Sequence, residues 1–347
     1  MRHNHSSAPN LARRRMVLAM PLLGSALWAS SAQGHTLGTL RRASQPLMGT
    51  KVDIVAEGTN GDQLTRAMDS AYTQMRRLEA LMSRYDPRSA VSRINLAAGI
   101  VPVKVPTEVM VVLEEAQRIS TLSGGAFDAT VGGLKAWNFG SGSQAIPRPG
   151  EIARQLACVD AHGLVLDQKA GTAFLVRQGM ALDLGGIAKL PILEAGMRVL
   201  QAQGVEHAML NGGGDVLVQG TLQGRPWRVG LRDPHSPAKL LGVVQVSGSA
   251  VVASSGDYER YFFHNGQRLH HILNPRTGLP TLGVHGVSLI ARNVAEVNGL
   301  GAAMMVLGPQ AGRQLAKNMP QVATLVAEQD GSVWKSAAME KLLLSVA

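Results

Sequence analysis

The feature of this sequence that most constrains its fold is a set of four short segments in which glycines stand close to a charged residue. Glycine accepts backbone conformations that other residues avoid, so such segments form tight turns and let backbone N–H groups approach a ligand closely. Each segment taken alone is more readily explained as a structural turn between two strands. None follows the G-x-G-x-x-G dinucleotide pattern or the G-x-x-x-x-G-K-[ST] phosphate loop. The four segments are 124–130 (GGAFDAT), 183–189 (DLGGIAK), 211–215 (NGGGD) and 254–260 (SSGDYER).

Two stretches carry residues suited to chemistry. The DLGGIAK segment ends in Lys189 just before a predicted helix, and a lysine beside a helix N-terminus suits a diphosphate. The stretch 270–278 (HHILNPRTG) combines two histidines, a proline-anchored turn, an arginine and a glycine. Histidine can accept a proton near neutral pH, and arginine can hold a phosphate. A histidine on an apolar segment is also commonly a buried structural residue, so both interpretations of this stretch stay open.

The order of predicted elements favours a single compact unit of the α+β class. Strand-like alternation at 50–56 is followed by helical spacing of apolar residues at 62–82, and both patterns recur along the chain. Hydrophobic residues make up 45% and charged residues 17%, which is enough to bury a sizeable core and excludes general disorder. The single cysteine, Cys158, excludes a disulfide framework and a cysteine-based zinc site. Further helices are expected at 108–122, 192–203, 298–307, 311–317 and 336–344, and further strands at 164–166, 172–176, 205–218, 227–231, 241–246 and 250–253.

The N-terminal residues have the features of an export leader. Three arginines at 13–15 precede an apolar run from Met16 to Ala29 that is too short to span a bilayer, and small residues follow it. The paired arginines, one further residue and Met16 match a twin-arginine signal. We therefore predict a signal peptide at 1–32, a linker at 33–44, a folded domain at 45–347 and a periplasmic location. A cytoplasmic protein with a basic tail is the alternative.

The leader also explains part of the net charge of +10. Its removal takes away four of the 34 basic residues and none of the 24 acidic ones, which leaves +6. Scattered basic residues and an aromatic content of 4% further argue against a nucleic-acid partner. No cysteine lies near the predicted cleavage site, so a lipid anchor on cysteine is excluded. We also expect no transmembrane segment after the leader is cleaved.

Taken together and in their order, the motifs resemble those of the ApbE family of FAD:protein FMN transferases. The resemblance covers about residues 45–345 and rests on Met48-Gly49-Thr50, Ser83-x-Tyr85 with Ser92 and Asn95, the glycine-rich segments and HHILNPRTG. It implies a T-fold-like architecture with a flavin site between subdomains. It also implies that the chain binds FAD, cleaves its diphosphate with a magnesium ion and attaches FMN through a phosphoester to a threonine of an acceptor protein, releasing AMP.

The resemblance assigns roles to individual residues. His271 matches the histidine that would deprotonate the acceptor threonine or assist its attack. The residues that match FAD contacts are Met48, Tyr85, Ala126, Phe127, Asp128, Asp183, Lys189 and Ile272.

The magnesium site departs from the family pattern. The family holds this ion by a backbone carbonyl, here that of Gly186, and by an Asp and a Thr of a late helix that reads A-D-A-L-x-T-A. This sequence reads V-N-G-L-G-A-A there, so Asn298 replaces the Asp and Ala302 replaces the Thr. An asparagine brings no charge and an alanine brings no side-chain oxygen. Asn274 likewise stands where Asp is usual, and Leu190-Pro191 replace the Gly-Tyr that follows the lysine.

Two functions follow from this pattern. The first is an exported transferase that moves FMN from FAD to a threonine of a redox protein in the cell envelope. The altered magnesium ligands keep open an alternative, a non-catalytic periplasmic flavin-binding maturation factor or flavin donor for an envelope redox system.

Overall fold

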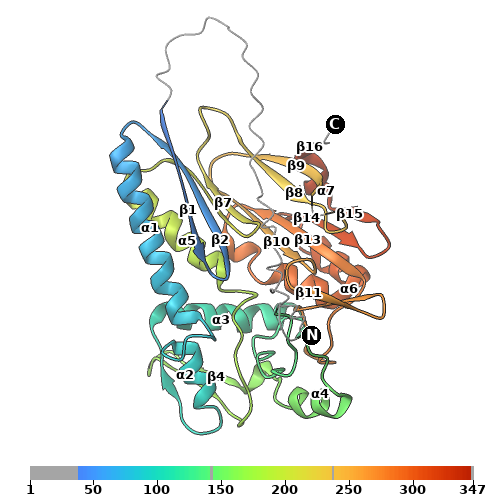
Figure 1. Ribbon diagram of the computed structural model, residues 1–347. Coiled ribbons are helices and arrows are strands. Elements are labelled where there is room, and N and C mark those ends of the chain that lie inside the picture. Colours follow the sequence, from blue (N-terminus) through green and yellow to red (C-terminus); the bar gives the residue numbers. More distant parts are fainter. Residues whose placement is uncertain (1–37, 141–143, 237, 345–347) are drawn as a thin grey trace, which may run out of the picture.

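The computed structural model describes residues 38–140, 144–236 and 238–344, so the predicted signal peptide and residues 33–37 lie outside the described part (Figure 1). The described chain begins with a strand in the segment expected to be a linker. Strand β1 (Thr39–Leu47) pairs antiparallel with β2 (Thr50–Gly58) along its whole length. Residues 39–44 therefore belong to the fold. The sequence pattern missed them because an edge strand is held by main-chain hydrogen bonds and its side chains here are largely polar.

An eight-stranded antiparallel sheet forms the centre of the molecule, in the order β1-β2-β6-β7-β10-β13-β14-β15. The predicted strand region 205–218 folds into two of these strands, which reverse direction at Gly213-Gly214, where φ is +68° and +102°. The strands that follow β2 are β6 (His207–Gly212), β7 (Asp215–Gln219), β10 (Ala250–Gly256), β13 (Val284–Ala291), β14 (Ala323–Glu328) and β15 (Val333–Lys335).

Both faces of this sheet are covered. Helices α1 (Gly61–Met82), α5 (Lys189–Ala202) and α6 (Leu300–Lys317) bury their apolar sides against one face. Helix α6 is interrupted at Gly308, before Pro309, which agrees with the predicted break between 307 and 311. The other face packs against a small sheet in the order β16-β9-β8 and helix α7. These elements are β8 (Trp227–Arg232), β9 (Leu240–Val246), α7 (Ala337–Leu342) and β16 (Leu343–Leu344).

The end of the chain differs from its predicted helix at 336–344. Helix α7 stops at Leu342, and Leu343 and Leu344 pair with Val244 and Val243 of β9. The pairing satisfies main-chain groups of the β9 edge, a tertiary contact that local helical spacing does not reveal.

A lower layer of short elements completes the fold, below the sheet in Figure 1. The predicted hairpin at 164–176 is confirmed as two strands of a small sheet in the order β3-β5-β4. One continuous apolar core joins this layer to the helices and the large sheet, which confirms a single compact α+β unit. The elements of the lower layer are α2 (Ala90–Leu96), β3 (Val103–Lys104), α3 (Thr107–Leu122), α4 (Pro149–Leu156), η1 (Ala161–Gly163), β4 (Leu164–Asp167) and β5 (Thr172–Leu175). The remaining elements of the described chain are β11 (Tyr261–His264), β12 (Gln267–His270) and η2 (Val294–Glu296).

Several turns lie together where neighbouring strands of the large sheet end. Because these strands are antiparallel neighbours in register, one end of the sheet carries the β1–β2 turn, the β6–β7 turn and the C-terminal end of β10. Helix α5 begins beside them, since Lys189 forms an ion pair with Asp215, the first residue of β7. The lower layer faces this end of the sheet (Figure 1). None of the helices within the described ranges is long and apolar enough to cross a membrane.

Candidate functional site

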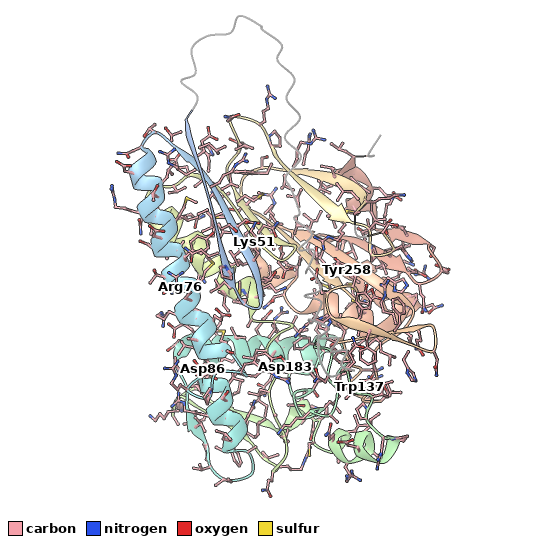
Figure 2. The ribbon with its side chains drawn as sticks, in the orientation of Figure 1. Lys51, Arg76, Asp86, Trp137, Asp183 and Tyr258 are labelled. Atoms are coloured by element: carbon pink, nitrogen blue, oxygen red, sulfur yellow. The ribbon has the colours of Figure 1, made fainter. Side chains whose placement is uncertain are left out.

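The DLGGIAK segment is fixed by its aspartate. One carboxylate oxygen of Asp183 accepts a hydrogen bond from the N–H of Gly185 at 2.8 Å, and the other lies 2.7 Å from Nη1 of Arg84. The main-chain N–H of Asp183 donates to the carbonyl of Ala129. Asp183 therefore ties the glycine turn to the end of α1 and to the GGAFDAT segment, where the sheet meets the lower layer (Figure 2).

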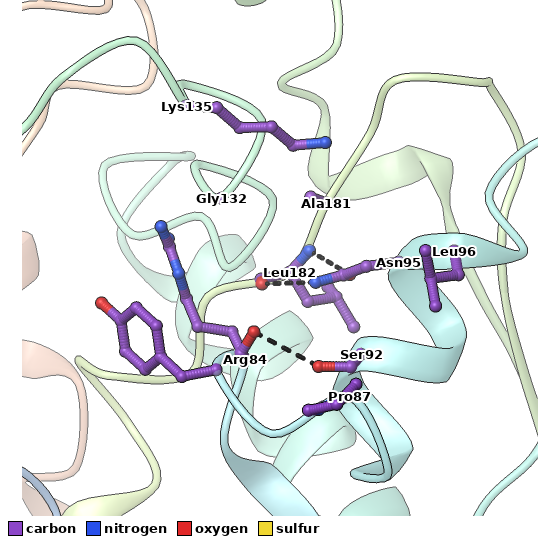
Figure 3. A pocket seen from close by; sticks show the side chains of 10 residues that line it. Arg84, Pro87, Ser92, Asn95, Leu96, Gly132, Lys135, Ala181 and Leu182 are labelled. Atoms are coloured by element: carbon purple, nitrogen blue, oxygen red, sulfur yellow. Dashed lines mark hydrogen bonds between the residues drawn. The ribbon is translucent and has the colours of Figure 1, made fainter.

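An open cleft of about 330 Å³ lies next to this turn (Figure 3), and Tyr85 is among the residues that line it. Tyr85 is 75% exposed, and the Arg84 guanidinium lies 5.2 Å from the centre of its ring. Ser92 and Asn95 also line the cleft, and the Asn95 amide forms two hydrogen bonds with the backbone of Leu182. The exposed aromatic face and the nearby cation suit a planar, electron-rich group of a nucleotide.

Lys189 joins three of the four glycine-rich segments. Its Nζ lies 3.3 Å from Oδ2 of Asp215 in the NGGGD segment. The other oxygen of that buried carboxylate accepts a hydrogen bond from the N–H of Ser254, the first residue of SSGDYER, at 2.9 Å. The segments lie far apart in the sequence, and this ion pair brings them together beside the N-terminus of α5. Backbone N–H groups, a lysine and a helix N-terminus together suit a diphosphate.

The fourth segment, GGAFDAT, approaches from the lower layer. A Cβ placed on Gly186 would lie 3.3 Å from Cε2 of Phe127, so the glycine permits close contact between the two turns. Ala126 is buried, and Asp128 accepts hydrogen bonds from both the N–H and the hydroxyl of Thr130. Burial raises the pKa of the Asp128 carboxyl. Phe127 is thus the residue of this group that meets the glycine turn, whereas Ala126 and Asp128 shape the segment from inside.

His271 follows directly after β12, and its ring is oriented by a single carbonyl. The carbonyl of Arg260 accepts hydrogen bonds from the His271 main-chain N–H at 3.1 Å and from its ring Nδ1 at 3.3 Å. This places the ring proton on Nδ1 and leaves the lone pair on Nε2. Burial, with the positive charges of Arg260 and Lys189, lowers the pKa of His271 to about 3. The imidazole is therefore neutral and can accept a proton through Nε2.

The neighbouring histidine has the structural role that the sequence left open. His270 is 2% exposed, its Nε2 hydrogen-bonds the carbonyl of Thr281 at 2.9 Å, and its Nδ1 accepts the N–H of Ile272. Burial lowers its pKa as well. Ile272 is half-buried and packs against the core. Both ring nitrogens of His270 are occupied, so of the two adjacent histidines His271 is the candidate base.

The rest of the HHILNPRTG loop is a hydrogen-bonded turn. The side-chain oxygen of Asn274 accepts the N–H of Arg276 at 2.8 Å, and the Asn274 carbonyl accepts the N–H groups of Thr277 and Gly278. An amide oxygen performs this task as well as a carboxylate, which explains why asparagine stands here. Arg276 then donates to the carbonyl of Gly124 at 2.6 Å and connects the loop to the GGAFDAT segment.

Met48 lies in the β1–β2 turn with φ of +54°, a backbone conformation that is uncommon for a residue other than glycine. Its N–H donates to Oε1 of Glu79 on α1 at 2.7 Å, and its side chain packs against the core. Met48 is therefore hydrogen-bonded to α1 and lies at the same end of the sheet as the other predicted residues.

The predicted magnesium ligands come together, but their chemistry does not fit the ion. A Cβ on Gly186 would lie 4.0 Å from Cβ of Ala302, and Asn298 is buried immediately before α6. The group therefore offers a backbone carbonyl, a neutral amide and a methyl group. Magnesium binds oxygen ligands that usually include a carboxylate. Within the described part of the chain, no cluster of three or more His, Cys, Asp or Glu side chains could hold a metal.

Three residues of the site were not assigned from the sequence, namely Arg84, Asp215 and Arg260. Each lies within or beside a motif, but its role depends on a partner far along the chain, 99 residues away for Arg84 and Asp183. The motifs themselves were the available signal, since all three residues belong to them or adjoin them.

Comparisons with known proteins agree with this geometry. The sequence profile of the ApbE family matches residues 48–326. The FAD:protein FMN transferase of Treponema pallidum is 32% identical over 291 residues, which cover 79% of this chain and 80% of that protein. The crystal structure of the ApbE protein of Thermotoga maritima superposes with a TM-score of 0.81 at 29% identity, over 88% of this chain and 100% of the other. The flavin transferase ApbE of Vibrio cholerae gives a TM-score of 0.76 at 26% identity, over 88% of this chain and 100% of that one. The protein belongs to the ApbE family.

Proposed function

We propose that this protein is a flavin transferase that takes FAD as its donor, attaches FMN to a threonine of an acceptor protein and releases AMP. The observation that carries the proposal is the meeting of Lys189, Asp215 and Ser254 at the N-terminus of α5, together with a neutral His271 that feels the charge of Lys189 and whose Nε2 has no partner among the described residues. The relatives named above as FAD:protein FMN transferases support the same chemistry. The alternative of a non-catalytic flavin carrier rests on the altered magnesium ligands, whereas the candidate base is present and oriented, which favours transfer.

The residues divide the reaction between them. Lys189 and the N–H groups at the start of α5 bind the diphosphate, and Tyr85 with Arg84 binds a planar part of the donor. Nε2 of His271 accepts the proton of the acceptor hydroxyl while the threonine oxygen attacks the phosphorus of the FMN moiety. The new O–P bond forms as the bond to the AMP phosphate breaks, and AMP leaves with that electron pair. Lys189 offsets the negative charge that grows on the leaving phosphate.

No step is assigned to magnesium. The family uses this ion, but Gly186, Asn298 and Ala302 supply too few oxygen ligands and no charge for it.

We also propose that the protein acts in the periplasm on a redox protein of the cell envelope. Support comes from the twin-arginine pattern before Met16 and the apolar run up to Ala29. Cell fractionation of the full chain, compared with a variant in which Arg13 and Arg14 are lysines, tests the export route. A variant that is exported equally well would contradict a twin-arginine leader.

Mass spectrometry tests the transfer directly. The protein is incubated with FAD and soluble domains of envelope redox proteins, and FMN addition to a threonine and AMP release are measured together. We expect His271→Gln to slow transfer by about 10²–10⁴-fold, because a general base is removed, while FAD binding persists. His264→Gln, on the exposed end of the β11–β12 hairpin, is the matched control and should transfer normally. Bound FAD without adduct or AMP across the acceptors would favour the carrier instead.

A further inference from the structure

The start of α6 determines what can lie against the DLGGIAK turn. Asn298 is 2% exposed, and its side-chain amide forms no hydrogen bond with any residue that the structure describes. A Cβ on Gly299 would lie 3.5 Å from Cδ1 of Ile187, so this part of the chain packs directly on the turn. The amide atoms of Asn298 are not among the fully enclosed polar atoms of the described chain that lack a partner, so they retain some access to solvent, and the amide can donate or accept hydrogen bonds with a ligand.

The exchange of charged and hydroxyl ligands for neutral groups changes the electrostatics of the site. A buried carboxylate at position 298 would need a cation beside it, whereas an amide needs only hydrogen bonds. Ala302 likewise presents a methyl group toward Gly186. At these two positions the chain therefore offers neither the carboxylate nor the hydroxyl that would bind a divalent ion.

Positive charge for a diphosphate is present on side chains instead. Lys189 is half-buried at the first position of α5, where its ion pair with Asp215 holds the Nζ in place and the helix dipole adds partial positive charge. The exposed guanidinium of Arg260 forms no ion pair within the described ranges of the chain. The carbonyl of Arg260 accepts a hydrogen bond from the His271 ring, which places Arg260 beside the candidate base, and the charges of Arg260 and Lys189 both lower the pKa of that ring.

We propose that this site binds the diphosphate of FAD without a divalent ion. Lys189 and Arg260 supply the positive charge that magnesium supplies in the family, and the Asn298 amide donates hydrogen bonds to the diphosphate. The inference rests on the proposed function. It concerns how this chain neutralises its donor.

Equilibrium binding of FAD, followed by flavin fluorescence, tests this in the full chain. The protein is freed of metal with EDTA, the absence of magnesium is verified by elemental analysis, and the Kd is measured in EDTA and in millimolar MgCl₂. We expect the two values to agree within about threefold. A larger tightening by magnesium would overturn the inference while leaving the proposed function intact. A chain that binds FAD in neither buffer would contradict both.

Variants test the named groups. Lys189→Gln and Arg260→Gln should each weaken FAD binding in EDTA by about tenfold, because each removes a charge-assisted hydrogen bond. Arg228→Gln, at an exposed position of β8, is the matched control and should leave the Kd unchanged. Unchanged binding by Lys189→Gln would place the diphosphate elsewhere and overturn the inference.

Placing a carboxylate at position 298, just before α6, gives a reciprocal test. Asn298→Asp should bind FAD more weakly in EDTA and recover on addition of magnesium, since the new carboxylate repels the diphosphate and attracts the ion. Asn318→Asp, an exposed position at the other end of α6, controls for the added charge. A folded Asn298→Asp protein whose Kd does not respond to magnesium would contradict the assignment. The wild-type comparison tests the inference even if this variant does not fold.

Discussion

The two adjacent histidines show how position in the fold separates residues of one type. His270 uses both ring nitrogens to join β12 to the loop that follows, whereas His271 uses one nitrogen and keeps the other free. Burial lowers the pKa of both rings, so both are neutral near pH 7. Only the ring with an uncommitted nitrogen can take a proton from an acceptor hydroxyl.

The low pKa of His271 leads to a prediction about ligand binding. In the free protein the ring titrates at a pKa of about 3, partly because Arg260 and Lys189 repel the protonated form. A bound diphosphate is negative and favours the protonated form, so FAD should raise the pKa of His271. Proton NMR of the imidazole with and without FAD measures this shift, and His271→Gln assigns the signal. A pKa that falls or stays unchanged on FAD binding would place the diphosphate away from this histidine.

At the scale of elements, the β11–β12 hairpin that leads to His271 is held by a buried carboxylate. Asp257 is 2% exposed and lies between Nη1 of Arg268 on β12, at 2.6 Å, and the ring of His285 on β13. Arg268 also lies over the rings of Tyr261 and Phe263 on β11. The carboxylate therefore fixes the hairpin to β13, an interior strand of the large sheet.

Asp257→Asn should loosen this hairpin. Removing one charge of a buried pair leaves the other without compensation, which costs about 3–5 kcal/mol when the partner is lost outright and less when an amide retains hydrogen bonds. We expect faster amide hydrogen exchange in residues 261–270 with the central strands still protected. Asp53→Asn, in the more exposed pair with Lys51, is the control. Equal exchange in the two variants would show that Asp257 does not anchor the hairpin.

The β6–β7 turn is a second element on which the site depends. Gly213 has φ of +68°, and a Cβ there would lie 2.6 Å from Oγ1 of Thr50 in the neighbouring turn. Gly213→Ala should therefore destabilise the protein by about 1–3 kcal/mol and disturb Asp215, measured by thermal unfolding and by FAD affinity. Gly150→Ala, in the first turn of α4, should be neutral or slightly stabilising, because its Cβ would meet only Nη1 of Arg154 at an ordinary 3.9 Å. A Gly213→Ala protein as stable as this control would show that the turn tolerates a side chain at this position.

At the scale of the whole molecule, the site depends on contact between the large sheet and the lower layer. The apolar core is continuous across them, and Arg84–Asp183 and Arg276–Gly124 add polar links. Residues from both parts surround the DLGGIAK turn, so neither part forms the site alone.

This continuity predicts one cooperative unfolding transition for the folded domain. Calorimetry should show a single peak whose calorimetric and van't Hoff enthalpies agree. FAD at about one hundred times its Kd should stabilise the native state by about 2.7 kcal/mol and shift that peak as a whole. Two separate peaks, with FAD moving only one of them, would show that the layers unfold independently.

The sequence by itself determined the class of fold, the long helices α1, α3, α5 and α6, several strands between β2 and β10, and the motifs that carry the chemistry, because periodicity and glycine turns are local properties. It missed helices α2 and α4, strands β1 and β3, and all strands from β11 onward, including the central strands β13 and β14, because a strand depends on pairing partners that lie elsewhere in the chain. Only the tertiary structure separated the roles of His270 and His271 and joined Lys189 to Asp215 and Ser254. It also showed that Asn298 and Ala302 lie against the DLGGIAK turn near Gly186, where these three residues offer no carboxylate among them. The physical reason is that burial, ion pairing and the choice of hydrogen-bond partner depend on residues that meet only when the chain has folded.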